Sequence, residues 1–177
     1  MIRKINGIFV FAGTLIMAYV MAESGKSLKT PETAMGIINL EFASTKHKVN
    51  MVLNAWSYPG TSKLDNISVA IKNTWFDFIF LFFYSLMLFY ACLSISNSFT
   101  GFLNRTGKLL ATGSLYAGLF DIIENAGMLI SLNGHPSNMV AIITATFSVM
   151  KWTLVICAIV FILVTGPAYI VNRLKRH

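Results

Sequence analysis

Three of the seven acidic residues in this 177-residue chain lie inside long apolar stretches: Asp77, Asp121 and Glu124. A fourth ionisable residue, Lys151, lies in another such stretch. An ionised side chain at the centre of a membrane helix costs at least ~2.5–3.5 kcal/mol, and it persists only where it faces protein or a water-filled cavity. These residues therefore predict a buried polar site, although they do not identify its chemistry.

The sequence GLFDIIENAGM contains the densest polar group. Asp121, Glu124 and Asn125 stand at i, i+3 and i+4, so they share one face of a helix. Two carboxylates one turn apart repel each other where the dielectric constant is low, so we expect a proton on one of them or a cation between them. Gly118 and Gly127 flank the group and would let another helix approach closely.

Two further polar stripes should face this group. Asp77 and Tyr84 are seven residues apart on one apolar stretch. Another stretch carries Thr144, Ser148 and Lys151 at i, i+4 and i+7. Glu41, in a polar connection, could cap the same cavity. The candidate ligand-binding residues are therefore Asp121, Glu124, Asn125, Lys151, Tyr84, Asp77 and Glu41.

A purely structural role is the alternative. Lys151 could pair with Asp121 or Glu124 and fix the register of the helices, while Asn125 and Tyr84 complete a hydrogen-bond network. Hydrogen bonds within membranes contribute only ~0.6 kcal/mol on average, so four buried charges are an inefficient way to hold helices together. We favour a functional pocket and keep both interpretations open.

Metal and cofactor chemistry is not expected. No histidine lies in an apolar stretch and no HExxH or ExxH pair occurs, which argues against zinc, copper and di-iron sites. Oxygen ligands from Asp77, Asp121, Glu124 and Asn125 could still hold a cation. The sequence contains no P-loop, dinucleotide-binding loop or Ser-His-Asp arrangement.

The composition indicates a membrane protein. The chain is 55% hydrophobic and only 12% charged, with a mean hydropathy of +0.66, whereas soluble domains carry about 25% charged residues. The net charge of +7 does not predict a nucleic-acid partner, because the basic residues lie at the edges of apolar stretches and form no basic domain.

Four apolar stretches, 5–22, 74–95, 109–132 and 139–164, each approach the ~20 residues that cross a ~30 Å hydrocarbon core. They predict an all-α fold, a four-transmembrane-helix bundle in which residues 1–177 form one integral membrane domain. The first stretch follows Arg3 and Lys4 and ends in Val-Met-Ala, so it also fits a cleavable signal peptide. We favour a retained helix, and cleavage of 1–22 stays open.

The positions of Lys and Arg predict the orientation. Basic residues in the short flanks of the spans fall on one side of the membrane if both termini are cytoplasmic. The long loop 23–73 carries six lysines on the other side, but long loops translocate with little regard to charge. We therefore expect a multi-pass protein of the cell membrane, in a bacterium the inner membrane, with the loop 23–73 outside. The basic residues concerned are Arg3, Lys4, Arg105, Lys108, Arg173, Lys175 and Arg176.

The loop 23–73 should be structured. Apolar residues at i, i+3, i+4 and i+7 predict a short amphipathic helix from Thr45, which a Tyr-Pro-Gly turn at 58–60 would end. Asp65 would cap an outward extension of the second span. The amphipathic helix could lie on the outer leaflet or close over the bundle as a lid. We favour the lid, because Trp56 and Glu41 need a buried environment.

These motifs resemble a family of small bacterial four-helix integral membrane proteins without an assigned activity. The resemblance covers about residues 40–152: LEFAST, a helix ending in Trp56, an Asp that opens the second span, D-x-x-E-N in the third and Lys151 in the fourth. It implies the fold and no reaction. In size and number of spans the chain is also similar to the EXPERA group, whose members bind amines and sterols in acid-lined membrane pockets.

Three functions fit these features. The first is a ligand-binding protein or small carrier for a cation, an amine or a polar-headed lipid. The second is a membrane enzyme on a lipid or isoprenoid substrate, with Glu124 or Asp121 as general acid or base and Lys151 or Tyr84 stabilising negative charge. The third is an accessory subunit of a membrane complex. The predicted partners are membrane lipids, a cationic or lipid-like small molecule, or a membrane protein.

Overall fold

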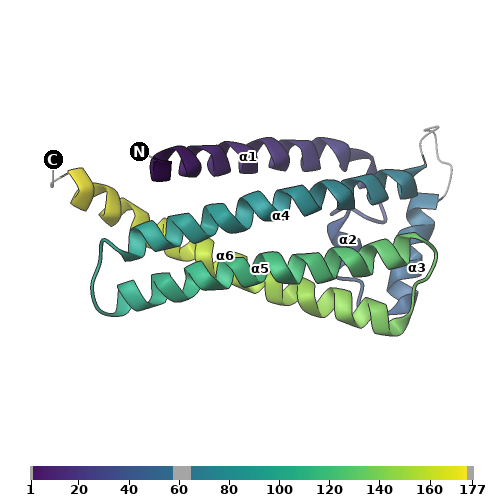
Figure 1. Ribbon diagram of the computed structural model, residues 1–177. Helices are drawn as coiled ribbons and strands as arrows, with labels where there is room; N and C mark the ends of the chain where they lie inside the picture. The colour runs from purple at the N-terminus through teal and green to yellow at the C-terminus, as the bar shows by residue number, and fades with distance from the viewer. Residues whose placement is uncertain (1, 58–64, 175–177) are drawn as a thin grey trace.

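The structure, a computed structural model, describes residues 2–57 and 65–174, and it contains only helices and connections in these ranges. The predicted turn at 58–60 and the basic residues Lys175 and Arg176 lie outside the described residues. In Figure 1 both chain ends lie at one end of the molecule, and α2 and α3 lie at the other. The helices are α1 (Ile2–Ser24), the 3-10 turn η1 (Lys26–Leu28), α2 (Ile38–Glu41), α3 (Lys46–Ser57), α4 (Asn66–Ser96), α5 (Phe102–Leu132) and α6 (Asn138–Leu174).

Four of these helices, α1, α4, α5 and α6, are long and apolar enough to cross a membrane, as predicted. They are longer than the predicted spans: α5 begins at 102 and not 109, and α6 continues to 174 through Pro167, whereas α4 begins at 66 because it includes the predicted outward extension of the second span. A 31-residue helix is about 46 Å long, which exceeds a ~30 Å hydrocarbon core. Hydropathy therefore detected the part of each helix suited to lipid and missed its polar ends.

Asp65 is the N-cap of α4, as predicted. Its carboxylate accepts hydrogen bonds from the Ser68 hydroxyl at 2.6 Å and from the Ile67 backbone N–H at 3.1 Å. The Ser68 hydrogen bond lowers the pKa of Asp65, and the backbone hydrogen bonds act in the same direction. Because the pKa is lowered on folding, the cap contributes its stability above the ordinary carboxyl pKa and loses it as the pH falls through the lowered value.

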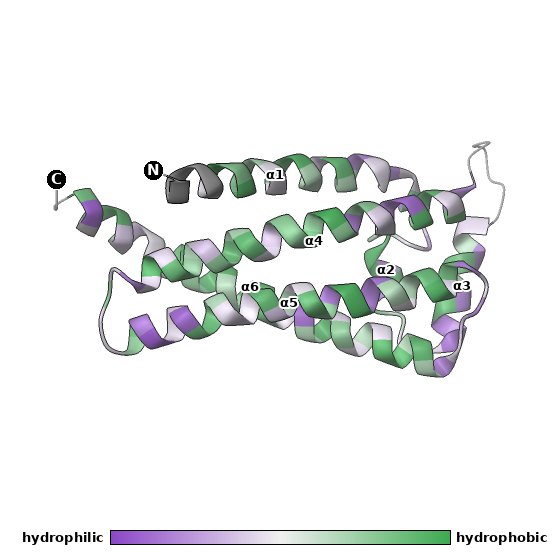
Figure 2. Cartoon of the chain, viewed as in Figure 1, coloured by the Kyte–Doolittle hydropathy of each residue, from purple (hydrophilic) through white to green (hydrophobic). Residues whose placement is uncertain are grey.

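Two apolar clusters lie at different levels of the bundle, and a polar layer separates them. In Figure 2 the long helices are mostly green, and purple segments interrupt α5 between its ends. The loop-side cluster consists of Leu28, Leu40, Ala43, Val49, Val52, Trp56, Ala70, Met128, Leu132 and Ala141. The terminal-side cluster consists of Leu81, Tyr84, Leu88, Cys92, Ile95, Ala111, Ala158 and Phe161. The candidate residues of α4, α5 and α6 lie mainly between them along each helix.

The predicted amphipathic helix exists as α3, and it covers the loop-side end of the bundle. Val49, Val52 and Trp56 are buried in the loop-side cluster together with residues of α5 and α6. The Trp56 indole N–H donates to the Leu28 carbonyl at 3.0 Å and contacts the Thr33 hydroxyl at 3.1 Å, which ties the start of the loop to α3. The lid prediction is therefore confirmed for packing against the bundle.

Close packing between α5 and α6 depends on Gly127. A Cβ at this position would overlap the Thr144 hydroxyl, and Thr144 is short and β-branched, so it has little freedom to move away. Gly113 on the same helix differs, because its Cβ would meet only the Leu154 Cδ2 atom at 3.4 Å, an ordinary contact. Alanine at position 127 therefore tests whether the helices need a close contact there, whereas alanine at position 113 tests the effect of helix propensity alone.

We expect Gly127→Ala to destabilise the bundle by roughly 1–3 kcal/mol through overpacking, which outweighs the ~1 kcal/mol that alanine gains in a helix interior. The control Gly113→Ala should be neutral or stabilising. Thermal unfolding of the purified protein in detergent measures both. Equal melting temperatures for the two variants would contradict a close α5–α6 contact at Gly127.

Candidate functional site

The site is centred on the ammonium group of Lys151, which lies among three carboxylates. Lys151 Nζ lies 3.1 Å from Asp121 Oδ1, 2.9 Å from both Glu124 oxygens and 3.5 Å from Glu41 Oε2. None of these four residues is more than 5% exposed. The helical spacing of Asp121 and Glu124 thus places both acids on one side of a single cation.

Two hydrogen bonds join α4 to this cluster. The Tyr84 hydroxyl donates to Asp121 Oδ2 at 2.7 Å, and the Asn125 amide donates to Asp77 Oδ2 at 2.9 Å. Among the described residues Asp77 forms no ion pair, although it is only 8% exposed. Asp77 is therefore a buried carboxyl group that accepts a hydrogen bond from a neutral amide.

Glu41 reaches the cluster from the loop. Its Oε2 atom accepts a hydrogen bond from the Trp152 indole N–H at 3.0 Å, and the Ser148 hydroxyl lies 3.4 Å from the same atom. Glu41 ends α2, a helix of one turn, so these contacts and the burial of Leu40 hold that turn against α6. The sequence stripe indicated Ser148, but the Trp152 donor was not anticipated, because no local pattern links positions 41 and 152.

The site contains more negative charge and more acceptors than its own groups can balance. Three buried carboxyl groups contact one ammonium, that of Lys151, and the fourth, Asp77, has no cationic partner within the described part of the chain. Glu124 Oε2 touches that ammonium without a directed hydrogen bond, and Asn125 Oδ1 is fully buried with no partner in the described ranges. The surplus charge must be neutralised by protons or by a bound cation.

A cavity of about 380 Å³ adjoins this cluster. Glu41, Asp77, Tyr84, Asp121 and Lys151 all contribute to its wall, whereas Glu124 and Asn125 do not. The remaining lining is almost entirely apolar and comes from α1, the turn at Ile37 and Ile38, α4 and α6. The full set of these other lining residues is Thr14, Met21, Ile37, Ile38, Phe80, Met87, Leu88, Trp152, Val155 and Ile159.

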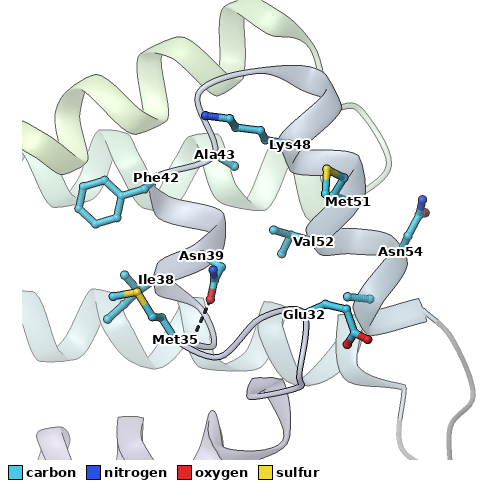
Figure 3. A pocket seen from close by; sticks show the side chains of 11 residues that line it. Glu32, Met35, Ile38, Asn39, Phe42, Ala43, Lys48, Met51, Val52 and Asn54 are labelled. Carbon is cyan, nitrogen blue, oxygen red and sulfur yellow. Dashed lines mark hydrogen bonds between the residues drawn. The ribbon is translucent and has the colours of Figure 1, made fainter.

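A second hollow, of about 770 Å³, lies in the loop between the segment 32–43 and α3. Figure 3 shows Met35, Ile38 and Phe42 on one side of it and Met51 and Val52 on the other. Its charged lining residues are one acid and one base, so it concentrates no charge. Ile38 lines both hollows, which makes α2 the partition between them.

The geometry does not favour a metal ion at the predicted oxygen site. Lys151 occupies the position between Asp121 and Glu124 where a cation would bind both carboxylates. Over residues 2–57 and 65–174, no three His, Cys, Asp or Glu side chains lie close enough together to hold a metal ion. The site is better suited to an organic cation or to protons.

Removal of the Lys151 ammonium should lower the stability of the protein strongly. We expect Lys151→Met to destabilise the protein by about 3–5 kcal/mol, because it leaves buried carboxyl groups without their counter-ion. The control Tyr84→Phe removes one hydrogen bond and should cost about 1 kcal/mol. Unfolding in detergent by increasing SDS measures both. A Lys151→Met protein as stable as the wild type would show that the carboxyl groups do not depend on this ammonium.

Comparisons with protein-family models, with curated proteins and with solved structures give no match for this chain. Its function therefore has to be inferred from the chemistry and the geometry of its own residues.

Proposed function

We propose that this chain is a membrane protein that binds a positively charged organic ligand in the acid-lined cavity beside α1, α4 and α6. One observation carries the proposal: beside a largely apolar cavity of about 380 Å³, three buried carboxyl groups share the Lys151 ammonium, and a fourth, Asp77, lines the cavity without an ion pair to the described residues. Ionisable groups at membrane depth generally mark functional sites. Apolar pockets of about 300–1,000 Å³ with a few polar groups are typical of sites for small molecules.

The residues divide into a supporting group and a binding group. Lys151, Asp121 and Glu124 form short ion pairs that fix the wall of the cavity. Asp77 lies on the same wall without an ion pair to the described residues, and Glu41 lies 3.5 Å from an ammonium that has two closer partners. Asp77, assisted by Glu41, is therefore the anchor for a ligand cation. Asn125 orients the Asp77 carboxyl group, and Tyr84 orients that of Asp121.

A purely structural role, in which the ion pairs only fix the register of the helices, explains this arrangement less well. One Lys–Glu pair is enough to fix the register of two helices, and each additional buried, uncompensated charge costs several kcal/mol. The surplus acids also face a cavity and not packed side chains. In addition, no acid of the cluster is more than 8% exposed, so the site offers little support for an accessory subunit whose acids face the helices of a partner.

The proposed setting is a multi-pass protein of the cell membrane with both termini in the cytoplasm. The four candidate spans and the distribution of Lys and Arg support this orientation, which places the loop that carries α2 and α3 outside. The cavity then lies nearer the outer side of the bundle. A small carrier would in addition need access from the cytoplasmic side.

A membrane enzyme is the second candidate, and one observation favours it. Tyr84, Asp121 and Lys151 form a continuous chain of hydrogen bonds of 2.7 and 3.1 Å along the cavity wall. Such a chain can move a proton to or from a bound lipid or isoprenoid substrate. Turnover of a lipid by the wild type and not by Tyr84→Phe would favour this candidate over a binding protein.

Binding should depend on the charge of Asp77. In nanodiscs, we expect at least one primary alkylammonium ion from a series between ethyl and dodecyl to raise the melting temperature. Asp77→Asn should weaken that binding at least about tenfold, because it replaces a charge-assisted contact of roughly 1.5–3 kcal/mol with a neutral one. Alcohols of the same chain lengths serve as uncharged ligands.

The matched control is Asp65→Asn, which removes an exposed acid far from the cavity and keeps a good helix cap. It should bind the ammonium ions as the wild type does. The proposal fails if no ammonium ion stabilises the protein, if Asp77→Asn binds as tightly as the wild type, or if the alcohols stabilise it equally.

A further inference from the structure

The carboxyl groups of the cavity lie toward its loop-side end, beside Met21, Ile37 and Ile38, whereas apolar side chains line the end nearer the termini. Glu41 and Asp77 lie at the loop-side end, whereas Met87, Leu88 and Ile159 lie at the end nearer the termini. From Asp77 to Leu88 the cavity follows α4 for about 16 Å, at ~1.5 Å per residue. The cavity thus has the polarity of an amphiphile with one charged end.

The apolar end of the cavity offers no free polar group among the described lining residues. Thr14 is a polar lining residue from α1, and its hydroxyl donates to the Val10 carbonyl of its own helix at 2.9 Å. The hydroxyl is therefore satisfied without a ligand, and Thr14 can present its methyl group. A small hydrated cation bound at Asp77 would leave this apolar end unfilled.

The wall between α1 and α6 is open at this level. Within the described residues, α1 packs along α4 and makes little contact with α6. Figure 1 shows α1 lying along α4 on the side away from α5. Asn73 holds the loop-side end of α1 by donating to the Met21 carbonyl at 3.0 Å and to the Ser24 hydroxyl at 2.8 Å. Ile159 lines the cavity and is 41% exposed, so the cavity reaches the lipid-facing surface of α6.

We infer that the ligand is a single-chain cationic amphiphile, an ammonium group on an unbranched hydrocarbon chain, which enters sideways between α1 and α6. Its ammonium group binds at Asp77 and Glu41, and its chain lies along Met87 and Ile159 toward the middle of the bilayer. This is the orientation of a lipid in the leaflet on the loop side, so the amphiphile need not invert to bind. The inference rests on the proposed function and specifies its class of ligand.

The first test blocks the end of the cavity that would hold the chain. In nanodiscs, dodecylammonium should bind the wild type at least about tenfold more tightly than ethylammonium, when both affinities are measured against the total concentration of the ammonium ion. Ile159→Trp should weaken dodecylammonium at least about tenfold and leave ethylammonium unchanged. The control Leu163→Trp, at a position that is 69% exposed on the same helix, should change neither. Val155→Phe is the smaller block if Ile159→Trp does not fold.

A second measurement tests the orientation of the chain. Trp152 lies at the charged end of the cavity, Trp75 is exposed, and Trp56 is buried in the loop-side cluster, so a background with both Trp56→Phe and Trp75→Phe leaves Trp152 as the single tryptophan. A dodecylammonium brominated beside its nitrogen should quench Trp152 fluorescence more than one brominated at the chain end. Stronger quenching by the chain-end bromine would overturn the orientation.

The outcomes separate the inference from the proposed function. If ethylammonium and dodecylammonium bind equally and both need Asp77, the site for a cation stands and the amphiphile is excluded. If the blocking variants leave dodecylammonium binding intact, the chain does not occupy the cavity and the inference fails. If no ammonium ion binds in an Asp77-dependent way, the proposed function and the inference fall together.

Discussion

The contact between the Lys151 ammonium and the two acids of α5 is the interaction on which the rest of this structure depends. It joins α6 to α5 at about 3 Å in a bundle interior where neither charge can be solvated by water. Tyr84 extends the contact to α4 through Asp121, and Glu41 extends it to α2. A single cation thereby organises three long helices and the loop.

This constraint also explains why the bundle is layered. A polar layer is stable at membrane depth only where apolar side chains exclude lipid and water above and below it. The loop-side cluster supplies one cover and the terminal-side cluster supplies the other. The loop is part of this arrangement, because residues of η1, α2 and α3 complete the loop-side cluster and because α2 delivers Glu41. The lid and the site therefore form one unit.

In the function that we propose, support of the site and binding of the ligand are assigned to different acids. Glu124 and Asn125 lie away from the cavity and hold its wall, whereas Asp77 and Glu41 line it. The ion cluster of Lys151, Asp121 and Glu124 thus forms part of the wall and its support, while Asp77 and Glu41 add further carboxyl groups to the same wall. Rigid positioning of a binding group by neighbours that do not touch the ligand is the general way in which a site gains precision.

Some features could be predicted from the sequence because they depend on distances of a few residues. The 3.6-residue period places Asp121, Glu124 and Asn125 on one face, and it makes α3 amphipathic with Trp56 inward. Asp65 caps α4 through contacts within three residues. Apolar length alone located the four long helices. The capping signal also gave the start of α4, but the start of α5 and the end of α6 were missed, because backbone hydrogen bonding continues where hydropathy falls.

Only the tertiary structure decided which acids meet Lys151, which of them line a cavity, and where that cavity opens. Glu41 and Trp152 are 111 positions apart, and no local period relates them. The opening beside α1 depends on how α1 packs against α4. Apolar composition does not determine this packing, because all sides of such a helix are suited to lipid. Helix periodicity is a local property of the backbone, whereas the pairing of buried charges depends on the packing of the whole bundle.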